Sequence, residues 1–367
     1  MNLNKKFYYK YIHLLYGHDT KFSKLLIRII TNPQNGFIVD EHLFITMYQN
    51  VYNELKSFGN VVYDDSGKNL YVRYYKHCHL MISHSSDKLS DILFTPRKVK
   101  QKIVYRYWGG LKINKGQGNS LLYKIQYKVK KSIISQAFSS FAAIGIANLI
   151  DIVDLSKVLK KETKYYYLSY VSNEYFDVIS NLKRELDINP IYNEKKKVLL
   201  GHRGTKENNH IEILKMLDAY GSDAFEIYIP LSYGDQEYIQ NVINYVNISG
   251  MKNVKIIKEF MEYPDYIKFL STIDIAIFDG NTSYALGNLS ILLLFNKTIY
   301  LNEHGVIAET MDKEGTRYNK ISDIGKISVE HFLELMVYPS DFKSDLCVKS
   351  TQDRVSNWKR MFEDLDS

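Results

Sequence analysis

Short runs of β-branched or aromatic residues alternate with helical patterns along the whole chain, and this alternation constrains the fold more than any other feature. In the first half, runs typical of strands occur at residues 11–16, 37–39, 61–63, 79–83, 103–108, 142–146 and 165–170. In the second half they occur at residues 198–200, 225–229, 254–257, 273–278 and 298–301, with helical patterns near 207–220, 235–248, 263–271, 284–295 and 304–312. Strands that alternate with helices form mainly parallel sheets, so the sequence predicts an α/β fold.

Asn189-Pro190 and the polar segment 193–197 interrupt this pattern near the middle of the chain. We therefore expect one domain over residues 1–193 and a second over residues 194–367, with a cleft between them. A chain of 367 residues is long enough for two domains of ordinary size. Ligands of parallel α/β sheets bind beyond the carboxyl ends of the strands, so functional residues are expected in the loops that follow the strands.

The formal net charge of +7 hides an asymmetry between the two halves. Residues 1–193 contain 28 Lys and Arg against 15 Asp and Glu, whereas residues 194–367 contain 20 against 26. The first half therefore carries +13 and favours an anionic partner, which is nucleic acid, a membrane surface or a phosphorylated substrate. Nucleic acid is the least favoured of these, because the 31 Tyr are spread over both halves and no recognition motif is present.

Several classes of protein are excluded by what the sequence lacks. No stretch reaches the roughly 18 consecutive apolar residues of a membrane-spanning helix. Residues 1–11 are rich in Lys and Tyr and contain no apolar signal core, so we expect a protein of the cytosolic side. The ten His include no H-E-x-x-H or comparable spacing, so neither a metal nor a cofactor is expected.

The most informative loop follows the predicted strand 198–200 and begins Gly201-His202-Arg203-Gly204. Glycine permits close backbone approach, the amino end of the next helix favours an anion, and an arginine binds phosphate oxygens with its guanidinium fork. The loop is neither a P-loop nor G-x-G-x-x-G. The alternative is a tight turn in which Asn208 or Asn209 caps the helix.

Three further polar loops follow strands of the same predicted sheet. They are residues 230–235 with Tyr233 and Gly234, residues 259–263 with Met261 and Glu262, and residues 279–288 with Gly287 and Asn288. Tyr233 is placed to stack on a base or sugar or, alternatively, covers a turn. Each loop alone is a weak indication, but four polar loops at one end of a sheet predict a pocket.

In the first half, His18 and Asp19 close the first predicted strand and precede an expected helix over residues 22–31. A His beside an Asp at the carboxyl end of a strand is placed for general-base catalysis on a hydroxyl group. Alternatively, Asp19 is the N-cap of the helix. Trp108 and Gly109 end another predicted strand, where a glycine either admits a second substrate or makes a turn.

A basic amphipathic helix is expected over residues 119–138. Leu122, Ile125, Val129 and Ile133 form an apolar stripe, and Lys124, Lys128 and Lys131 lie on the opposite face. Such a helix binds an anionic bilayer. The commoner alternative is a surface helix whose apolar stripe packs into the core.

Taken together, these segments resemble glycosyltransferase family 56, of the enterobacterial common antigen type. The matching segments of the second half are residues 198–212, 229–235, Asp265-Tyr266, Asp274 and Leu286-Gly287-Asn288. Those of the first half are residues 12–15, Gly17-His18-Asp19 and Trp108-Gly109-Gly110. The resemblance spans most of the chain.

The resemblance implies a GT-B fold, which has two Rossmann-like domains with mainly parallel sheets facing an interdomain cleft. The second domain would bind a TDP- or UDP-sugar through Gly201, His202, Arg203, Gly204, Asn209, Tyr233, Gly234, Met261, Glu262, Gly287 and Asn288. The first would bind a polyprenyl-pyrophosphate-linked glycan at the inner face of the cell membrane through Trp108, Gly109, Lys124, Lys128 and Lys131, with Asp19 or His18 as the base. The alternatives are a protein or teichoic-acid-like acceptor, or a non-catalytic sugar- or nucleic-acid-binding relative.

Overall fold

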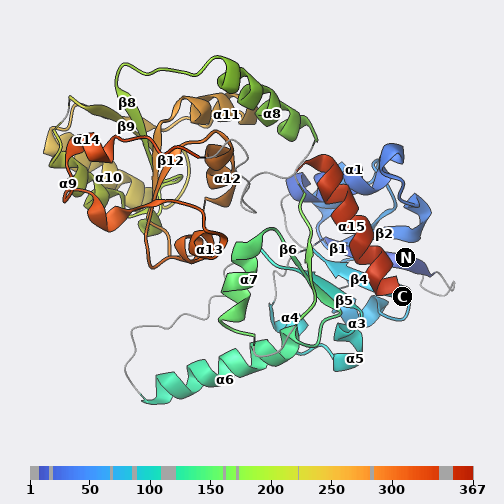
Figure 1. Cartoon of the computed structure of the whole chain (residues 1–367). Helices are drawn as coiled ribbons and strands as arrows, with labels where there is room; N and C mark the ends of the chain where they lie inside the picture. Colours follow the sequence, from blue (N-terminus) through green and yellow to red (C-terminus); the bar gives the residue numbers. More distant parts are fainter. Residues whose placement is uncertain are drawn as a thin grey trace. The chain divides into compact units, whose positions relative to one another are not determined.

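The computed structural model describes residues 8–15, 20–66, 69–84, 89–108, 121–159, 163–170, 173–221, 223–281, 285–338 and 350–366 (Figure 1). Its internal contacts divide the chain into two compact units. The first unit consists of residues 1–172 together with 350–367, and the second of residues 173–349.

The first unit is built on a parallel sheet of seven strands in the order β3-β2-β1-β4-β5-β6-β7. The strands are β1 (Tyr9–Leu15), β2 (His42–Thr46), β3 (Val61–Tyr63), β4 (Cys78–Ser83), β5 (Ile103–Arg106), β6 (Ala143–Ile146) and β7 (Tyr165–Tyr167). The order reverses direction between β1 and β4, which makes this pair the topological switch point of the sheet.

One predicted strand of the first unit is wrong. Residues Val39–Glu41 form a 3₁₀ turn, and the strand begins only at His42. Ile38 is 63% exposed, whereas every residue of β2 is buried. A central strand of a parallel sheet is covered on both faces, so its residues are buried. The buried run 42–46 therefore forms the strand, and the predicted run 37–39 does not.

Helices cover both faces of this sheet. The helices are α1 (Thr20–Thr31), α2 (Gln49–Leu55), α3 (Leu70–Tyr74), α4 (Leu89–Leu93), α5 (Arg97–Lys100), α6 (Leu121–Phe138), α7 (Leu149–Ser156) and α15 (Thr351–Asp366), with 3₁₀ turns at Pro33–Asn35 and Val39–Glu41. Side chains of α3 to α7 form the core on one face. Side chains of α1, α2 and α15 form the core on the other.

The second unit repeats this plan with a parallel sheet of six strands in the order β10-β9-β8-β11-β12-β13. The strands are β8 (Lys196–Leu200), β9 (Phe225–Pro230), β10 (Val254–Ile257), β11 (Ile275–Phe278), β12 (Thr298–Leu301) and β13 (Asn319–Lys320). The helices are α8 (Asn173–Ile188), α9 (His210–Asp218), α10 (Gln236–Ser249), α11 (Tyr263–Thr272), α12 (Leu286–Leu294), α13 (Val306–Glu314) and α14 (Val329–Phe332), with 3₁₀ turns at Lys206–Asn208 and Ile321–Asp323. Its switch point lies between β8 and β11.

The second unit differs from the domain expected over residues 194–367 at both of its ends, since it begins at residue 173 and ends at residue 349. Helix α8 precedes that break and packs against α11 of the second sheet. Helix α15 ends the described chain but packs against β7 of the first sheet, where it buries Trp358 and Met361 completely. Helix packing, and not the Asn-Pro break, therefore sets the limits of the units.

Candidate functional site

The loops after β8 and β9 are joined backbone to backbone at the carboxyl edge of the second sheet. The amide of Gly204 donates to the carbonyl of Tyr233 (2.9 Å), and the amide of Asp235 donates to the carbonyl of Gly204 (2.8 Å). Gly234 has φ 138°, and a Cβ atom there would overlap the backbone of Gly204. A Cβ atom on Gly204 would overlap Ile239. Both glycines therefore permit a close approach, but the atoms that lie close to them belong to the neighbouring loop and to α10 of the protein.

Gly201 also occupies a position where a side chain would not fit. Its φ is 69°, and a Cβ atom there would lie 2.6 Å from Nε2 of the fully buried His210. Burial, with the neighbouring His202, lowers the pKa of His210 to about 3. Burial and the positive charge of Arg203 lower the pKa of His202 to about 4. Both imidazoles are neutral at pH 7, so the positive charge of the loop rests on Arg203 and Lys206.

The two asparagines of this loop do not cap helix α9 with their side chains. Asn208 braces the loop instead, since its Nδ2 donates to the carbonyl of Arg203 (3.1 Å) and to Oγ1 of Thr205 (3.1 Å). Asn209 occupies the N-cap position with a left-handed backbone (φ 49°), but its side chain makes no cap hydrogen bond. The expectation of an Asn cap is therefore wrong, because the Asn209 side chain is directed to another loop.

That loop begins at Asp279, directly after β11. Nδ2 of Asn209 donates to Oδ2 of Asp279 (2.9 Å), and Nδ2 of Asn302 donates to Oδ1 (2.8 Å). These three residues follow the adjacent strands β8, β11 and β12, so the carboxylate lies at the switch point of the sheet. The sequence predicted polar loops at this edge but not this carboxylate as a site residue.

A second contact lies between α11 and α12. Nδ2 of Asn288 donates to the hydroxyl of Tyr266 (2.7 Å). Burial is the main cause that raises the pKa of Tyr266, and the phenol of Tyr233 adds to it. Gly287 has open space where a Cβ atom would be.

The predicted site residues of the second unit all follow strands of one parallel sheet and therefore lie at its carboxyl edge. Met261 and Glu262 lie at the start of α11, where the carbonyl of Glu262 accepts from the amide of Tyr266 (2.9 Å). Among the described residues, neither side chain is hydrogen-bonded to the other loops. Sequence reasoning missed Asp279, Asn302 and Tyr266 as site residues, although the first two follow strands and were open to the same argument as the others.

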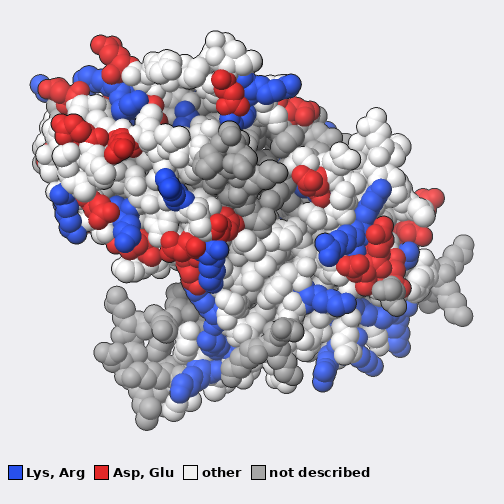
Figure 2. All heavy atoms as spheres, viewed as in Figure 1, with Lys and Arg blue, Asp and Glu red and all other residues white. Residues whose placement is uncertain are grey.

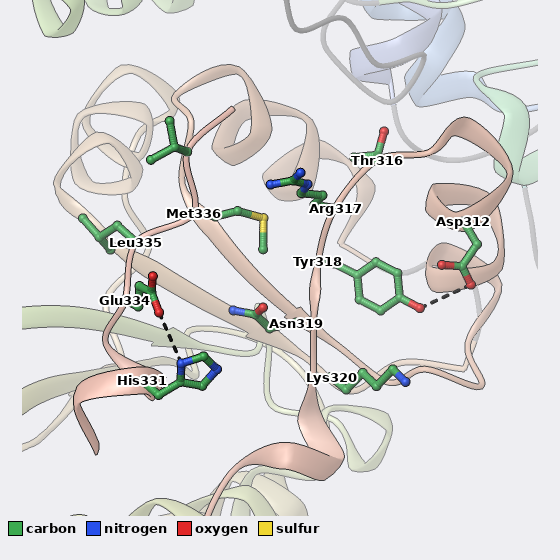
Figure 3. A pocket seen from close by; sticks show the side chains of 11 residues that line it. Asp312, Thr316, Arg317, Tyr318, Asn319, Lys320, His331, Glu334, Leu335 and Met336 are labelled. Carbon is green, nitrogen blue, oxygen red and sulfur yellow. Dashed lines mark hydrogen bonds and ion pairs between the residues drawn. The ribbon is translucent and has the colours of Figure 1, made fainter. Parts of the chain in front are cut away.

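One pocket of the described second unit lies away from these loops (Figure 3). Its volume is about 560 Å³, and it borders the edge strand β13. The amide of Met336, which lines it, donates to Oγ1 of Thr298, the first residue of β12 (2.7 Å). In its wall, the hydroxyl of Tyr318 donates to Oδ2 of Asp312 (3.3 Å), and Nδ1 of His331 lies 3.2 Å from a carboxylate oxygen of Glu334. The pocket therefore lies beside the edge strand β13, and its wall reaches the start of β12 through Met336.

In the first unit, three buried histidines form a hydrogen-bonded chain. Nδ1 of His13 is 2.9 Å from Nε2 of His84, and Nε2 of His13 is 2.9 Å from Nδ1 of His42. Nδ1 of His84 is bonded to the hydroxyl of the buried Tyr170. Each of the three imidazoles is at most 7% exposed. The amide of His84 donates to the carbonyl of Leu14 (3.1 Å), so the chain reaches the switch point of the first sheet.

Burial keeps these imidazoles neutral. It lowers the pKa of His42 to about 4 and that of His84 to about 3, and it lowers the pKa of His13 well below its usual value. His13 uses a different ring nitrogen for each neighbour, so the three rings do not converge on one point. Consistently, no three His, Cys, Asp or Glu side chains in the described ranges are placed to hold one metal ion.

Trp108 lies at the end of this chain. Its indole N–H donates to the carbonyl of His84, and its ring stacks on Tyr170 with centroids 5.4 Å apart. The indole is 43% exposed, so one part of the ring remains open to a ligand. The expected base residues His18 and Asp19, together with Gly109 and the side chain of Lys124, lie outside the described residues.

The apolar stripe of α6 is exposed. Ile125 is 50%, Val129 53% and Ile133 46% exposed, and Lys128 is exposed beside them. The alternative that this stripe packs into the core is therefore wrong, because Ile134 and Phe138 on another side of the helix make the core contacts. Figure 1 shows the amino end of α6 projecting away from the sheet of its unit. Within the described ranges, no helix has the length and apolar character needed to cross a membrane.

Comparison with known proteins now decides the family. Residues 42–323, about three quarters of the chain, match the family described as 4-alpha-L-fucosyltransferase glycosyl transferase group 56. The chain belongs to glycosyltransferase group 56. This group 56 protein is therefore a glycosyltransferase, and its two parallel sheets form the GT-B fold.

Solved structures agree with this fold. A glycosyltransferase from Rickettsia africae has a TM-score of 0.61 at 11% identity, with 98% of this chain and 99% of that chain covered. Anabaena HepE in complex with UDP has a TM-score of 0.58 at 13% identity, with 97% and 95% covered. The α,α-trehalose-phosphate synthase of Burkholderia vietnamiensis has a TM-score of 0.54 at 8% identity, with 97% and 96% covered. Similarity at this identity shows the fold alone. Among curated proteins, no sequence matches the group 56 protein significantly.

Proposed function

We propose that this group 56 enzyme transfers a deoxy-amino sugar from a TDP- or UDP-sugar to a polyprenyl-pyrophosphate-linked glycan in cell-envelope polysaccharide synthesis. The observation that carries the proposal is the meeting of the loops after β8, β9, β11 and β12 at the switch point of the second sheet. Nucleotides bind at this position in doubly wound sheets. HepE, which has a similar fold, was crystallised with UDP.

Arg203 and the amino end of α9 supply the chemistry for the donor diphosphate. The first amide groups of a helix have no intrahelical acceptor and carry a partial positive charge. The first amide of α9, that of His210, already donates to the hydroxyl of Tyr238 (3.0 Å), so the Arg203 guanidinium and the amides that follow that of His210 would stabilise the negative charge that develops on the departing diphosphate. The neutral His202 and His210 do not add to this charge. Asp19 or His18, which follow β1 in the sequence, would take the proton of the acceptor hydroxyl.

We further propose that α6 attaches the enzyme peripherally to an anionic membrane at the cytoplasmic face. Its exposed stripe of Ile125, Val129 and Ile133 is flanked by exposed lysines, including Lys128 and Lys130. The first unit contains 29 Lys and Arg against 15 Asp and Glu. Figure 2 shows Lys and Arg side chains over α5 and α6. Apolar side chains surrounded by lysines are typical of helices that lie in the membrane interface.

The donor proposal is tested by the thermal stability of the protein with UDP, TDP and a single-stranded oligonucleotide. A nucleotide at 100 times its Kd should stabilise the folded protein by about 2.7 kcal/mol. Stabilisation by UDP or TDP alone supports sugar transfer, and stabilisation by the oligonucleotide alone favours the non-catalytic alternative. Product analysis with a lipid-linked glycan, a protein and a teichoic-acid-like polymer then distinguishes the acceptors.

The membrane proposal is tested by binding to vesicles that contain anionic phospholipid. Replacing Ile125, Val129 and Ile133 by Ser should weaken binding at least tenfold, because each buried CH₂ group contributes about 0.8 kcal/mol to membrane affinity. Ile248→Ser serves as the control, since Ile248 is 86% exposed on α10 of the second unit. Equal binding of the triple variant and the control would contradict the proposal.

A further inference from the structure

The pocket beside β13 offers a second place where the second unit can hold a ligand. Its volume of about 560 Å³ lies within the range of roughly 300–1,000 Å³ that is typical of small-molecule sites. Its main walls are residues 316–320, which lead into β13, and residues 334–337, which follow α14. None of the described residues that line it belongs to the loops assigned to the nucleotide sugar. A ligand can therefore occupy this pocket while a donor is bound.

The two carboxylates of the wall already have partners within the protein. A carboxylate oxygen of Glu334 lies 3.2 Å from Nδ1 of His331. Oδ2 of Asp312 accepts a hydrogen bond from the hydroxyl of Tyr318 (3.3 Å). The cations of the pocket therefore decide which charge a ligand carries.

Arg317 is the cation that faces the space between the two main walls. Figure 3 shows its side chain and that of Met336 pointing into this space, whereas Lys320 points to the other side of its strand. Within the part of the chain that the structure describes, the Arg317 guanidinium forms no ion pair and no hydrogen bond. A guanidinium presents its N–H groups as a planar fork that fits a carboxylate or a phosphate. This part of the pocket therefore suits an anionic group.

The wall opposite Arg317 is apolar. Leu335, Met336 and Val337 follow one another in the chain, and Leu335 is 41% and Val337 81% exposed. The hydrogen bond from the Met336 amide to Oγ1 of Thr298 (2.7 Å) holds this segment at the start of β12. Apolar surface that is open to water gains free energy when a ligand covers it. A ligand with an anionic group beside an apolar body therefore matches both walls.

We propose that this pocket binds a small organic anion, whose carboxylate or phosphate pairs with Arg317 and whose apolar body covers Leu335, Met336 and Val337. The inference goes beyond the proposed sugar transfer and does not depend on it. The alternative is that Arg317 only protects the edge of the sheet, since charged side chains prevent edge strands from pairing with other chains. In that case, Arg317→Gln would leave the affinity for every small anion unchanged.

The experiment measures Kd values by NMR titration with phenyl phosphate, benzoate, inorganic phosphate and benzyl alcohol. The first two probes carry an anionic group and an apolar ring, whereas inorganic phosphate lacks the ring and benzyl alcohol lacks the charge. We expect phenyl phosphate or benzoate to bind more tightly than the other two probes, and the tighter of these two identifies the anionic group. Arg317→Gln should raise this Kd about 10- to 100-fold, because charge-assisted hydrogen bonds are lost. Lys326→Gln, which removes an exposed positive charge outside the pocket, is the matched control and should leave this Kd unchanged.

Arg203→Ala distinguishes this pocket from the donor site. If Arg203→Ala abolishes binding of the probe and Arg317→Gln does not, the probe occupies the donor site and the inference is overturned. Equal Kd values in the wild type and Arg317→Gln, or a wild type that binds neither phenyl phosphate nor benzoate, would also overturn it.

Met336→Ala tests the apolar wall independently of Arg317. The variant keeps the backbone amide that donates to Thr298 and shortens only the side chain. It should raise the Kd of the tighter aromatic probe about 3- to 10-fold, because apolar contact is lost, and leave that of inorganic phosphate unchanged. Inorganic phosphate that binds the wild type as tightly as phenyl phosphate, or an unchanged Kd in Met336→Ala, would contradict the proposal.

Discussion

Lowering the pH from 7 to 5 should strongly destabilise the first unit, because its three buried histidines stay neutral in the folded state but take up protons when the chain unfolds. In the folded state the pKa of His42 is about 4, that of His84 is about 3, and that of His13 is well below its usual value. In the unfolded chain each has a pKa near 6.5. The unfolded state therefore binds more protons below pH 6.5, and stability falls with pH until the folded-state values are reached.

The magnitude follows from the number of groups. Each histidine that is neutral when folded and charged when unfolded removes about 1.4 kcal/mol per pH unit. The loss begins only near the unfolded-state pKa of 6.5, so three such groups remove about 6 kcal/mol between pH 7 and pH 5, which is comparable to the whole stability of an ordinary domain. Adjacent imidazolium ions would repel each other, so the three histidines cannot all become protonated while the first unit stays folded.

The assay is urea unfolding at pH 7, 6 and 5, followed by tryptophan fluorescence. Both tryptophans, Trp108 and Trp358, belong to the first unit, so the signal reports on that unit. His42→Gln should reduce the pH dependence of the unfolding free energy by about one third. His79→Gln, which removes a partly exposed imidazole of the same sheet, is the control. A wild-type free energy of unfolding that is the same at pH 7 and pH 5 would refute the reasoning.

Three further predictions concern the two sites. Arg203→Ala should weaken the binding free energy of UDP or TDP by roughly 1.5–3 kcal/mol, measured by calorimetry. An unchanged Kd would favour a purely structural turn. Gly234→Ala should lower the free energy of urea unfolding, followed by circular dichroism, by about 3 kcal/mol, because its Cβ would overlap the Gly204 backbone. Gly287→Ala, whose Cβ meets nothing within 4 Å, should leave stability unchanged or slightly higher. Asp19→Asn should reduce kcat roughly 10²- to 10⁴-fold with normal donor binding, whereas full activity would remove Asp19 from the mechanism.

The parallel sheets were predictable because their strands are local patterns. Val61–Tyr63, Val254–Ile257 and Thr298–Leu301 begin and end where the sequence placed them. Strand β2 was missed because His42 and Thr46 are polar residues that tertiary contacts bury. The order of the strands then brings the polar loops of the second unit to one edge, as expected from the α/β pattern.

The contacts between loops were not predictable from the sequence. The sequence offered two roles for Asn209, donor binding or, as the alternative, a helix cap shared with Asn208, and it gave no sign that a left-handed backbone would direct the side chain to Asp279. For Gly201 and Gly204 the sequence left open a close approach to a ligand or a tight turn, and it could not show that protein atoms lie where their Cβ atoms would be. The chain His42–His13–His84 joins residues that are 29 and 71 positions apart, so only the pairing of β1 with β2 and β4 reveals it.

Helix α15 affects the order in which the molecule can be synthesised and folded. It contributes the fully buried Trp358 and Met361 to the core of the first unit, although the whole second unit precedes it in the chain. While residues 350–366 are still inside the ribosome, the nascent first sheet must expose the apolar face that α15 later covers. The core of the second unit, as far as the structure describes it, contains no residue of α15. This core can therefore form before α15 is synthesised, whereas the core of the first unit is completed last, although its first strand is made first.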